Sequence, residues 1–144
     1  MASSSWDQVT FSLSPRSKGC YLITNEVLDK VPQIKQYEVG MLNLFLQHTS
    51  AGLTLNENCD PDVRADMNTS LDRVAPEGDF YIHADEGPDD MPGHVKSSVV
   101  GVSVDIPITN GRLNTGTWQG VYLCEFRTYR HTRRIVATLN GRKK

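Results

Sequence analysis

The run of residues 39–47, VGMLNLFLQ, constrains the fold of this chain more than any other segment. Apolar residues dominate it, and an apolar run of this length is typical of a strand at the middle of a sheet. We therefore expect a central strand that is buried on much of both faces. Six other segments have the composition or the alternation of strands, and they are residues 6–13, 20–23, 52–57, 102–108, 121–129 and 134–139.

The clearest helix signal begins at Asp60. Asp60 is a good N-cap, and Pro61 suits the first helical position. Apolar residues then recur at helical spacing, at Val63, Met67, Leu71 and Val74. The pattern predicts an amphipathic helix that ends before Pro76.

Two further helices and a hairpin complete the pattern. Thr24 or Asn25 can cap a short helix that runs to about residue 30, and residues 91–100 can form another. The pair Asn110–Gly111 is a strong hairpin signal. Together the elements predict an α+β fold, with a mainly antiparallel sheet or sandwich packed against helices. We expect one domain over residues 1–144, with its core at about residues 6–140.

Composition excludes several classes of protein. A chain of 144 residues can bury a sizeable core, and a net charge of −2 gives no reason to expect binding to nucleic acid or to a membrane surface. No segment approaches the roughly 20 apolar residues of a membrane span. Three cysteines without metal-site spacing, Cys20, Cys59 and Cys124, predict free thiols and a cytoplasmic protein.

Ionisable residues gather in residues 80–101, FYIHADEGPDDMPGHVKSSVVG. His83 and His94 stand at either side of the acidic residues Asp85, Glu86, Asp89 and Asp90. Imidazole and carboxylate groups are common ligands of first-row metals, so the loop can form a metal site. Acid–base catalysis by either histidine and a hydrogen-bonded acidic loop without a ligand remain the alternatives.

A second polar group, His48-Thr49-Ser50, follows the apolar run. These side chains at a strand end can bind an anion or orient a substrate hydroxyl, or they can form a turn that satisfies its own backbone. Asn56, Glu57 and Asp60 lie where a strand is followed by a helix, a place that suits ligand binding. Capping alone would explain Asp60.

The glycine-rich turn of residues 115–120 has an aromatic residue at its centre. Trp118 and Gln119 can receive a planar ligand there, although a tight loop with a core tryptophan is an equal alternative. Glu125 and Arg127 in the next strand share a face and can form an ion pair. Residues 129–134, the most basic segment, are expected to form a solvated hairpin turn.

These segments together resemble the YjbQ family, often described as secondary thiamine-phosphate synthases. The motifs that carry the resemblance are QHTSAGLTLNEN at residues 47–58, DPDV at 60–63, YIHADEGPDDMPGHVKSSVVG at 81–101 and IPITNGRLNTGTWQGVYLCEFR at 106–127. The resemblance covers residues 11–139 in the same order. It implies a compact α+β fold that assembles as a homotrimer.

The resemblance also implies an activity. Family members are credited with a secondary ability to condense hydroxymethylpyrimidine diphosphate with thiazole phosphate, releasing pyrophosphate, so the resemblance implies a phosphorylated small molecule as the substrate. The family pattern points to His48, His83 and His94 as catalytic residues and as ligands of a divalent metal, Zn²⁺ or Mg²⁺, with Glu86 as a further catalytic residue. The expected substrate-binding residues are Thr49, Ser50, Asn56, Glu57, Asp60, Asp89, Asp90, Trp118, Gln119, Glu125 and Arg127. A non-enzymatic trimeric protein that binds a metal or metabolite, and a metal-dependent hydrolase of a phosphorylated substrate, are the alternatives.

Overall fold

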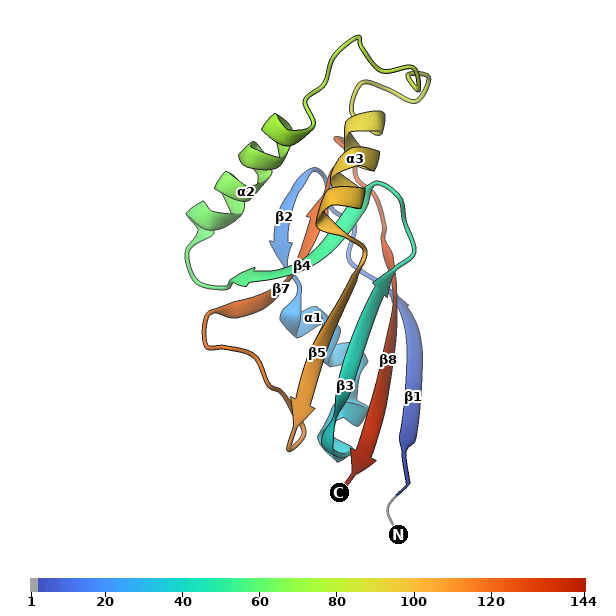
Figure 1. Ribbon diagram of the computed structural model, residues 1–144, viewed down its shortest axis with the longest axis vertical. Helices are drawn as coiled ribbons and strands as arrows, with labels where there is room; N and C mark the ends of the chain where they lie inside the picture. Colours follow the sequence, from blue (N-terminus) through green and yellow to red (C-terminus); the bar gives the residue numbers. More distant parts are fainter. Residues whose placement is uncertain (1–2) are drawn as a thin grey trace.

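The computed structural model describes residues 3–144, in which two antiparallel sheets and their helices form an elongated α+β structure (Figure 1). The larger sheet has the strand order β1-β8-β3-β5-β6. Its strands are β1 (Ser5–Ser12), β8 (Arg134–Lys143), β3 (Tyr37–Leu46), β5 (Ser103–Thr109) and β6 (Arg112–Leu113). The smaller sheet, in the order β2-β7-β4, consists of β2 (Gly19–Leu22), β7 (Gln119–Glu125) and β4 (Ala51–Glu57). The predicted fold class is confirmed.

The helices lie in two places. Helices α2 (Pro61–Val74) and α3 (Asp90–Val100) lie beside the smaller sheet, at the end of the molecule away from the chain termini (Figure 1). Helix α1 (Thr24–Lys30) and the 3₁₀ helix η1 (Pro32–Gln36) supply buried apolar side chains to a core that also takes residues from both sheets. The sheets therefore share one core, and α3 places its first turn at the outer end of the smaller sheet.

The central strand is buried on one face only, so the expectation of two covered faces is wrong for this chain. Leu42 and Leu44 of β3 are fully buried, whereas Met41 and Phe45 expose 43% and 46% of their surface on the opposite face. The error has a physical cause. Apolar residues occupy both faces of β3, so the run lacks the period-two alternation that distinguishes a strand with one face in solvent.

The predicted start of α2 and the predicted hairpin turn are confirmed, but the predicted cap of α1 is not. Asp60 accepts a hydrogen bond from the Asp62 backbone N–H at 2.9 Å, which confirms the predicted N-cap of α2. Asn110 and Gly111 both have positive φ, as a type I′ hairpin turn requires. The predicted cap of α1 is wrong, because the Thr24 hydroxyl accepts from the Val121 backbone N–H instead. The Thr24 hydroxyl, which local rules assign to the helix cap, therefore bonds to strand β7 instead.

Asp60→Ala is expected to lower the free energy of unfolding by about 1 kcal/mol, because the Asp62 N–H loses its side-chain acceptor. Urea denaturation measures the loss. Asp66→Ala is the matched control, since Asp66 is an exposed acidic residue in the same helix, and its effect should stay within about 0.5 kcal/mol. Equal losses in the two variants would show that the cap contributes nothing.

The composition predicts no membrane-spanning segment and three free thiols. Among residues 3–144, no helix is both long and apolar enough to cross a membrane. Cys20, Cys59 and Cys124 are free thiols, as predicted. Cys20 and Cys124 face one another on β2 and β7, with their sulfur atoms 3.7 Å apart.

Candidate metal centre

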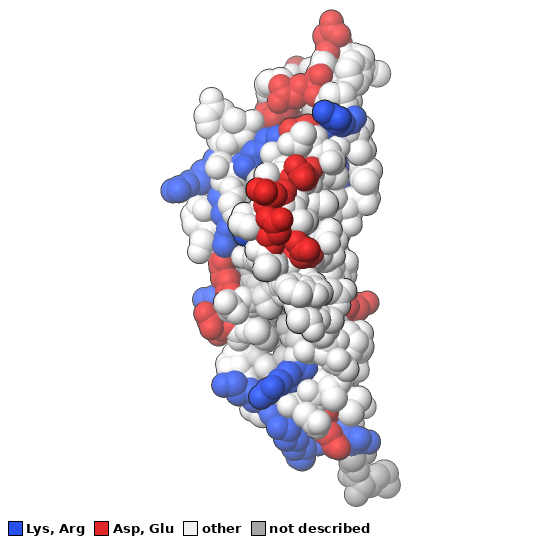
Figure 2. All heavy atoms as spheres, turned by 90° about the vertical axis from the view of Figure 1, so that its left-hand side faces the viewer, with Lys and Arg blue, Asp and Glu red and all other residues white. Residues whose placement is uncertain are grey.

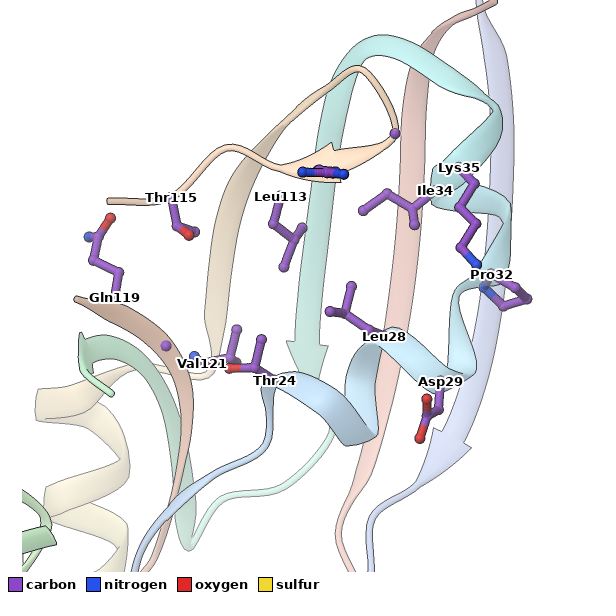
Figure 3. A pocket seen from close by; sticks show the side chains of 13 residues that line it. Thr24, Leu28, Asp29, Pro32, Ile34, Lys35, Leu113, Thr115, Gln119 and Val121 are labelled. Atoms are coloured by element: carbon purple, nitrogen blue, oxygen red, sulfur yellow. Dashed lines mark hydrogen bonds between the residues drawn. The ribbon is translucent and has the colours of Figure 1, made fainter. Parts of the chain in front are cut away.

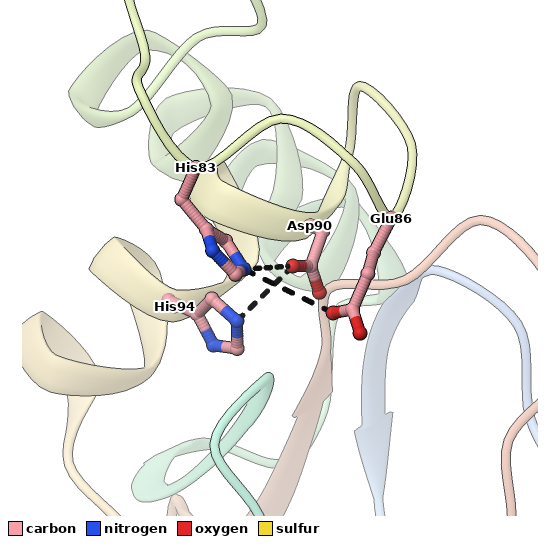
Figure 4. Close-up of side chains that lie close together, drawn as sticks. All are labelled: His83, Glu86, Asp90 and His94. Atoms are coloured by element: carbon pink, nitrogen blue, oxygen red, sulfur yellow. Dashed lines mark hydrogen bonds and ion pairs between the residues drawn. The ribbon is translucent and has the colours of Figure 1, made fainter.

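The loop of residues 80–89 brings two side chains against the first turn of α3. Gly87, with φ +104°, makes the turn that leads into the helix. Asp90 and His94 stand one helical turn apart on the same face of α3, and His83 and Glu86 approach them from the loop (Figure 4). One ligand atom from each of these four residues lies within 4.8 Å of all the others. We call the four residues the His83–His94 cluster.

Asp90 is the hub of this cluster. Its Oδ2 atom lies 2.9 Å from His83 Nε2 and 3.2 Å from His94 Nε2, and its Oδ1 accepts from Arg127 Nη1 at 2.9 Å. The residue is only 1% exposed. Burial raises the pKa of Asp90, but the charge of His94, the hydrogen bond from His83 and the Arg127 guanidinium outweigh it and hold that pKa below its ordinary value. Asp90 is therefore an ionised, fixed carboxylate.

The His94 ring is oriented by the backbone of the neighbouring turn. Its Nδ1 atom lies 2.8 Å from the carbonyl oxygen of Thr49. A carbonyl can only accept, so Nδ1 carries a proton and donates it. Nε2 is then the nitrogen that faces Asp90. This arrangement, in which one ring nitrogen binds a backbone carbonyl and the other is aimed at a ligand position, is typical of metal-binding histidines.

Arg127 ties the acidic loop to the end of β7. It donates from Nε to Asp89 Oδ2 and from Nη2 to the Glu86 carbonyl, both at 2.9 Å. Asp89 also accepts from the Thr128 N–H at 2.8 Å. Burial raises the pKa of Asp89, but these hydrogen bonds outweigh it and lower that pKa. Hydrogen bonds from the end of β7 thus hold Asp89 and the Glu86 backbone in place beside the cluster.

The structure does not bring His48 into the cluster. His48 Nε2 accepts from the Arg134 backbone N–H at 2.8 Å, which occupies the lone pair of a neutral ring. Burial, with the charges of Arg133 and Arg134, lowers the pKa of His48 and keeps it neutral near pH 7. His48 nevertheless shares a hollow of about 640 Å³ with Thr49 and His94. Within one chain it is a neighbour of the cluster and supplies no ligand atom to it.

Arg133 is a buried charged residue beside this region that the sequence did not indicate. Residues 129–134 were expected to form a solvated turn, yet Arg133 is 4% exposed and bonds to Glu125 Oε1 at 2.6 Å and Oε2 at 2.7 Å. It also donates to the Ser50 hydroxyl at 2.9 Å. Glu125 therefore pairs with Arg133, and the ion pair expected between Glu125 and Arg127 does not form. No local pattern marks one arginine of a basic segment as buried.

The remaining predicted residues lie elsewhere. Strands β4 and β7 pair antiparallel with Ala51 opposite Glu125 and Glu57 opposite Gln119, so six residue steps, about 20 Å, separate the two ends of this ladder. Thr49, Ser50, Glu125 and Arg127 lie at the end near the cluster. The other end holds the predicted substrate-binding residues Asn56, Glu57, Asp60, Trp118 and Gln119. The structure does not join the two groups into one pocket.

The second group makes mainly local contacts. Asn56 accepts from the Glu57 N–H, and Gln119 Oε1 accepts from the Gly116 N–H at 2.9 Å. Trp118 exposes 62% of its surface. The roles of these residues in substrate binding stay predictions.

Comparison with known proteins identifies the family. The family described as "UPF0047 protein YjbQ-like" matches residues 9–142. The UPF0047 protein YjbQ of Escherichia coli O157:H7 is 50% identical over 136 residues, which cover 94% of this chain and 99% of that protein. This chain belongs to the YjbQ (UPF0047) family. UPF0047 protein YugU of Bacillus subtilis is 41% identical over 109 residues, covering 71% of this chain and 80% of YugU.

Solved structures of YjbQ proteins support the fold. A YjbQ/UPF0047 protein from Clostridium acetobutylicum has a TM-score of 0.78 at 37% identity, and the match covers 89% of this chain and 97% of that one. A protein from Sulfolobus solfataricus, described as YbjQ-like and of unknown function, has the same TM-score at 22% identity, over 98% and 99% of the two chains. Neither description assigns a reaction to the protein.

Proposed function

We propose that this chain is a metal-dependent enzyme that acts on a phosphorylated small molecule. The observation that carries the proposal is the convergence of two imidazole nitrogens and two carboxylates within 4.8 Å. In this proposal His83, Glu86, Asp90 and His94 hold one divalent ion.

The donor set fits a transition metal better than Mg²⁺. Mg²⁺ prefers an octahedron of oxygen ligands, whereas imidazole suits Zn²⁺, Cu²⁺, Fe²⁺ and Ni²⁺. Zn²⁺ accepts ligands of this mixed nitrogen and oxygen type, and with all four residues bound it would have to become five-coordinate to take a water or substrate as well. The Thr49 carbonyl behind His94 and the Arg127 guanidinium behind Asp90 supply the outer contacts that orient such ligands.

The exposure of the four side chains favours a catalytic over a structural ion. The side chain of Asp90 is 2% exposed, while those of His83 and Glu86 are 53% and 65% exposed. One side of the cluster is therefore fixed in protein, and the other is open to a substrate or water. When bound, a divalent ion would supply Lewis acidity and lower the pKa of a water ligand.

The hollow beside His94 supports the choice of a phosphorylated substrate. Thr49 and Ser98 line it with exposed hydroxyl groups that can donate to phosphate oxygens. Neutral His48 faces the same space and can orient a substrate group by hydrogen bonding. Arg133 holds Ser50 in place behind this turn.

The family resemblance implies one particular reaction and one assembly. Thiamine-phosphate synthesis releases pyrophosphate, an anion that a divalent ion in the cluster would bind. This activity, the homotrimer and the cytoplasmic location stay predictions. The exposed apolar residues of the larger sheet, such as Trp6, Met41 and Phe45, support an assembly that covers this face. Light scattering after gel filtration measures the assembly.

Zinc titration of the chelator-treated protein by calorimetry tests the metal site. One Zn²⁺ per chain is expected. His83→Ala and His94→Ala should each weaken zinc binding by about 100-fold or more, because each removes a ligand from the cluster. His131→Ala is the matched control, since His131 bonds to the Tyr129 carbonyl outside the cluster, and it should leave the affinity unchanged. Equal affinity in all four proteins would refute the assignment of the ligands.

Product analysis then distinguishes enzyme from binding protein. The zinc-loaded chain is incubated with hydroxymethylpyrimidine diphosphate and thiazole phosphate, and separately with p-nitrophenyl phosphate. Thiamine phosphate in the first arm indicates a synthase, and phosphate release in the second indicates a hydrolase. Tight zinc binding without turnover in either arm would favour a non-enzymatic binding protein.

A further inference from the structure

A second hollow lies apart from the His83–His94 cluster, where α1 and η1 meet the β5–β6 hairpin and the start of β7 (Figure 3). Its volume is about 550 Å³. Pockets that bind small molecules have volumes of roughly 300–1,000 Å³. Neither the proposed metal centre nor its substrate hollow shares a residue with this space.

The floor of the hollow is aliphatic. Leu28 of α1 and Leu113 of β6 point toward one another across it, and Ile34 and Val121 line its walls (Figure 3). Leu28 and Leu113 are only partly buried, so apolar surface remains for a ligand to cover. Among residues 3–144, no aromatic side chain lines the hollow, so these residues offer no stacking surface for a planar ring. An aliphatic body fits this lining.

The rim of the hollow carries positive charge. Lys35 and Arg112 are exposed on it, and among residues 3–144 neither side chain forms an ion pair or a side-chain hydrogen bond. Asp29 is the one acidic lining residue in the part of the chain that the structure describes, and its carboxylate points away from Leu113 (Figure 3). Figure 2 shows one group of Lys and Arg side chains at the end of the molecule that holds the chain termini, and others in the opposite half. Two free cations beside an apolar floor complement a ligand with an anionic head.

We propose that this hollow binds a free aliphatic anion, with its hydrocarbon chain between Leu28 and Leu113 and its carboxylate or phosphate beside Lys35 and Arg112. The hydrocarbon is held by burial of apolar surface, and the head by two charge-assisted hydrogen bonds at the rim. The site is separate from the metal centre, because none of its lining residues belongs to the His83–His94 cluster.

Titration of the full chain with decanoate, followed by methyl NMR, tests the proposal. Saturable shifts of the Leu28, Leu113 and Val121 methyl groups are expected, with a Kd of about 0.1–1 mM for a ligand of this size. Decylammonium, which has the same chain and the opposite charge, should bind at least about tenfold more weakly. No shift in these methyl groups, or equal binding of the two probes, would overturn the proposal.

Variants separate the two halves of the site. Lys35→Glu/Arg112→Glu reverses both charges at exposed positions and should weaken decanoate binding by about tenfold or more. Arg130→Glu, an equally exposed change on the loop after β7, should leave it unchanged. Leu113→Trp should fill the hollow and abolish binding, with the amide spectrum as the check of folding. Unaltered binding in both hollow variants would place decanoate elsewhere and overturn the assignment.

Discussion

Replacing Arg133 with methionine is expected to lower the free energy of unfolding by about 3–5 kcal/mol. Arg133 bonds to both oxygens of Glu125, which is 0% exposed, so the variant leaves a carboxylate buried opposite an apolar side chain. The Ser50 carbonyl and hydroxyl lose their arginine donor as well. Urea denaturation of the chelator-treated protein measures the loss as a lower midpoint at unchanged slope.

The double variant Glu125→Gln/Arg133→Met shows whether the stranded charge causes the loss. Because both charges are then absent, it should be more stable than Arg133→Met alone. Arg134→Met is the matched control, since Arg134 is the exposed neighbour and its removal should cost no more than about 0.5 kcal/mol. A double variant as unstable as the single one would show that packing, rather than charge, dominates.

Arg127→Met is expected to cost about 2–4 kcal/mol in the metal-free protein. Arg127 neutralises Asp89 and Asp90, which are 8% and 1% exposed, and also holds the Glu86 carbonyl. The loss should be smaller than for Arg133, because Asp89 keeps its bond from Thr128. Amide hydrogen exchange should quicken in residues 83–89, since the loop loses its anchor to the end of β7.

Arg127→Lys should restore little of this stability. One ammonium cannot reproduce a planar guanidinium that donates to three separate groups. Arg130→Met, on the exposed loop nearby, serves as the control and should leave both stability and amide exchange unchanged. If Arg127→Lys restored the wild-type rate of amide hydrogen exchange in residues 83–89, the positive charge, and not the several N–H donors of the guanidinium, would hold the loop.

The sequence predicted elements whose cause is local. Asp60 and Pro61 define the start of α2, and the Asn110–Gly111 pair defines a hairpin, because capping and turn geometry depend on neighbouring residues alone. The burial of β3 on one face could not be predicted in this way. It depends on which side of the larger sheet α1 and η1 cover, and that is a property of the whole chain.

For the candidate site, the sequence alone was enough to recognise the family motifs and the acidic loop with its two histidines. His94 and Asp90 are four residues apart, so helix geometry alone places them on one face of α3. Only the tertiary structure decided the rest. It made Asp90 the hub, separated His48 from the cluster, buried Arg133, and set Gln119 about 20 Å along the β4–β7 ladder from Glu125. The physical reason is that these outcomes depend on strand register and on tertiary contacts such as Arg127 with Asp90, 37 positions apart, and Arg134 with His48, 86 positions apart, which no local period or spacing encodes.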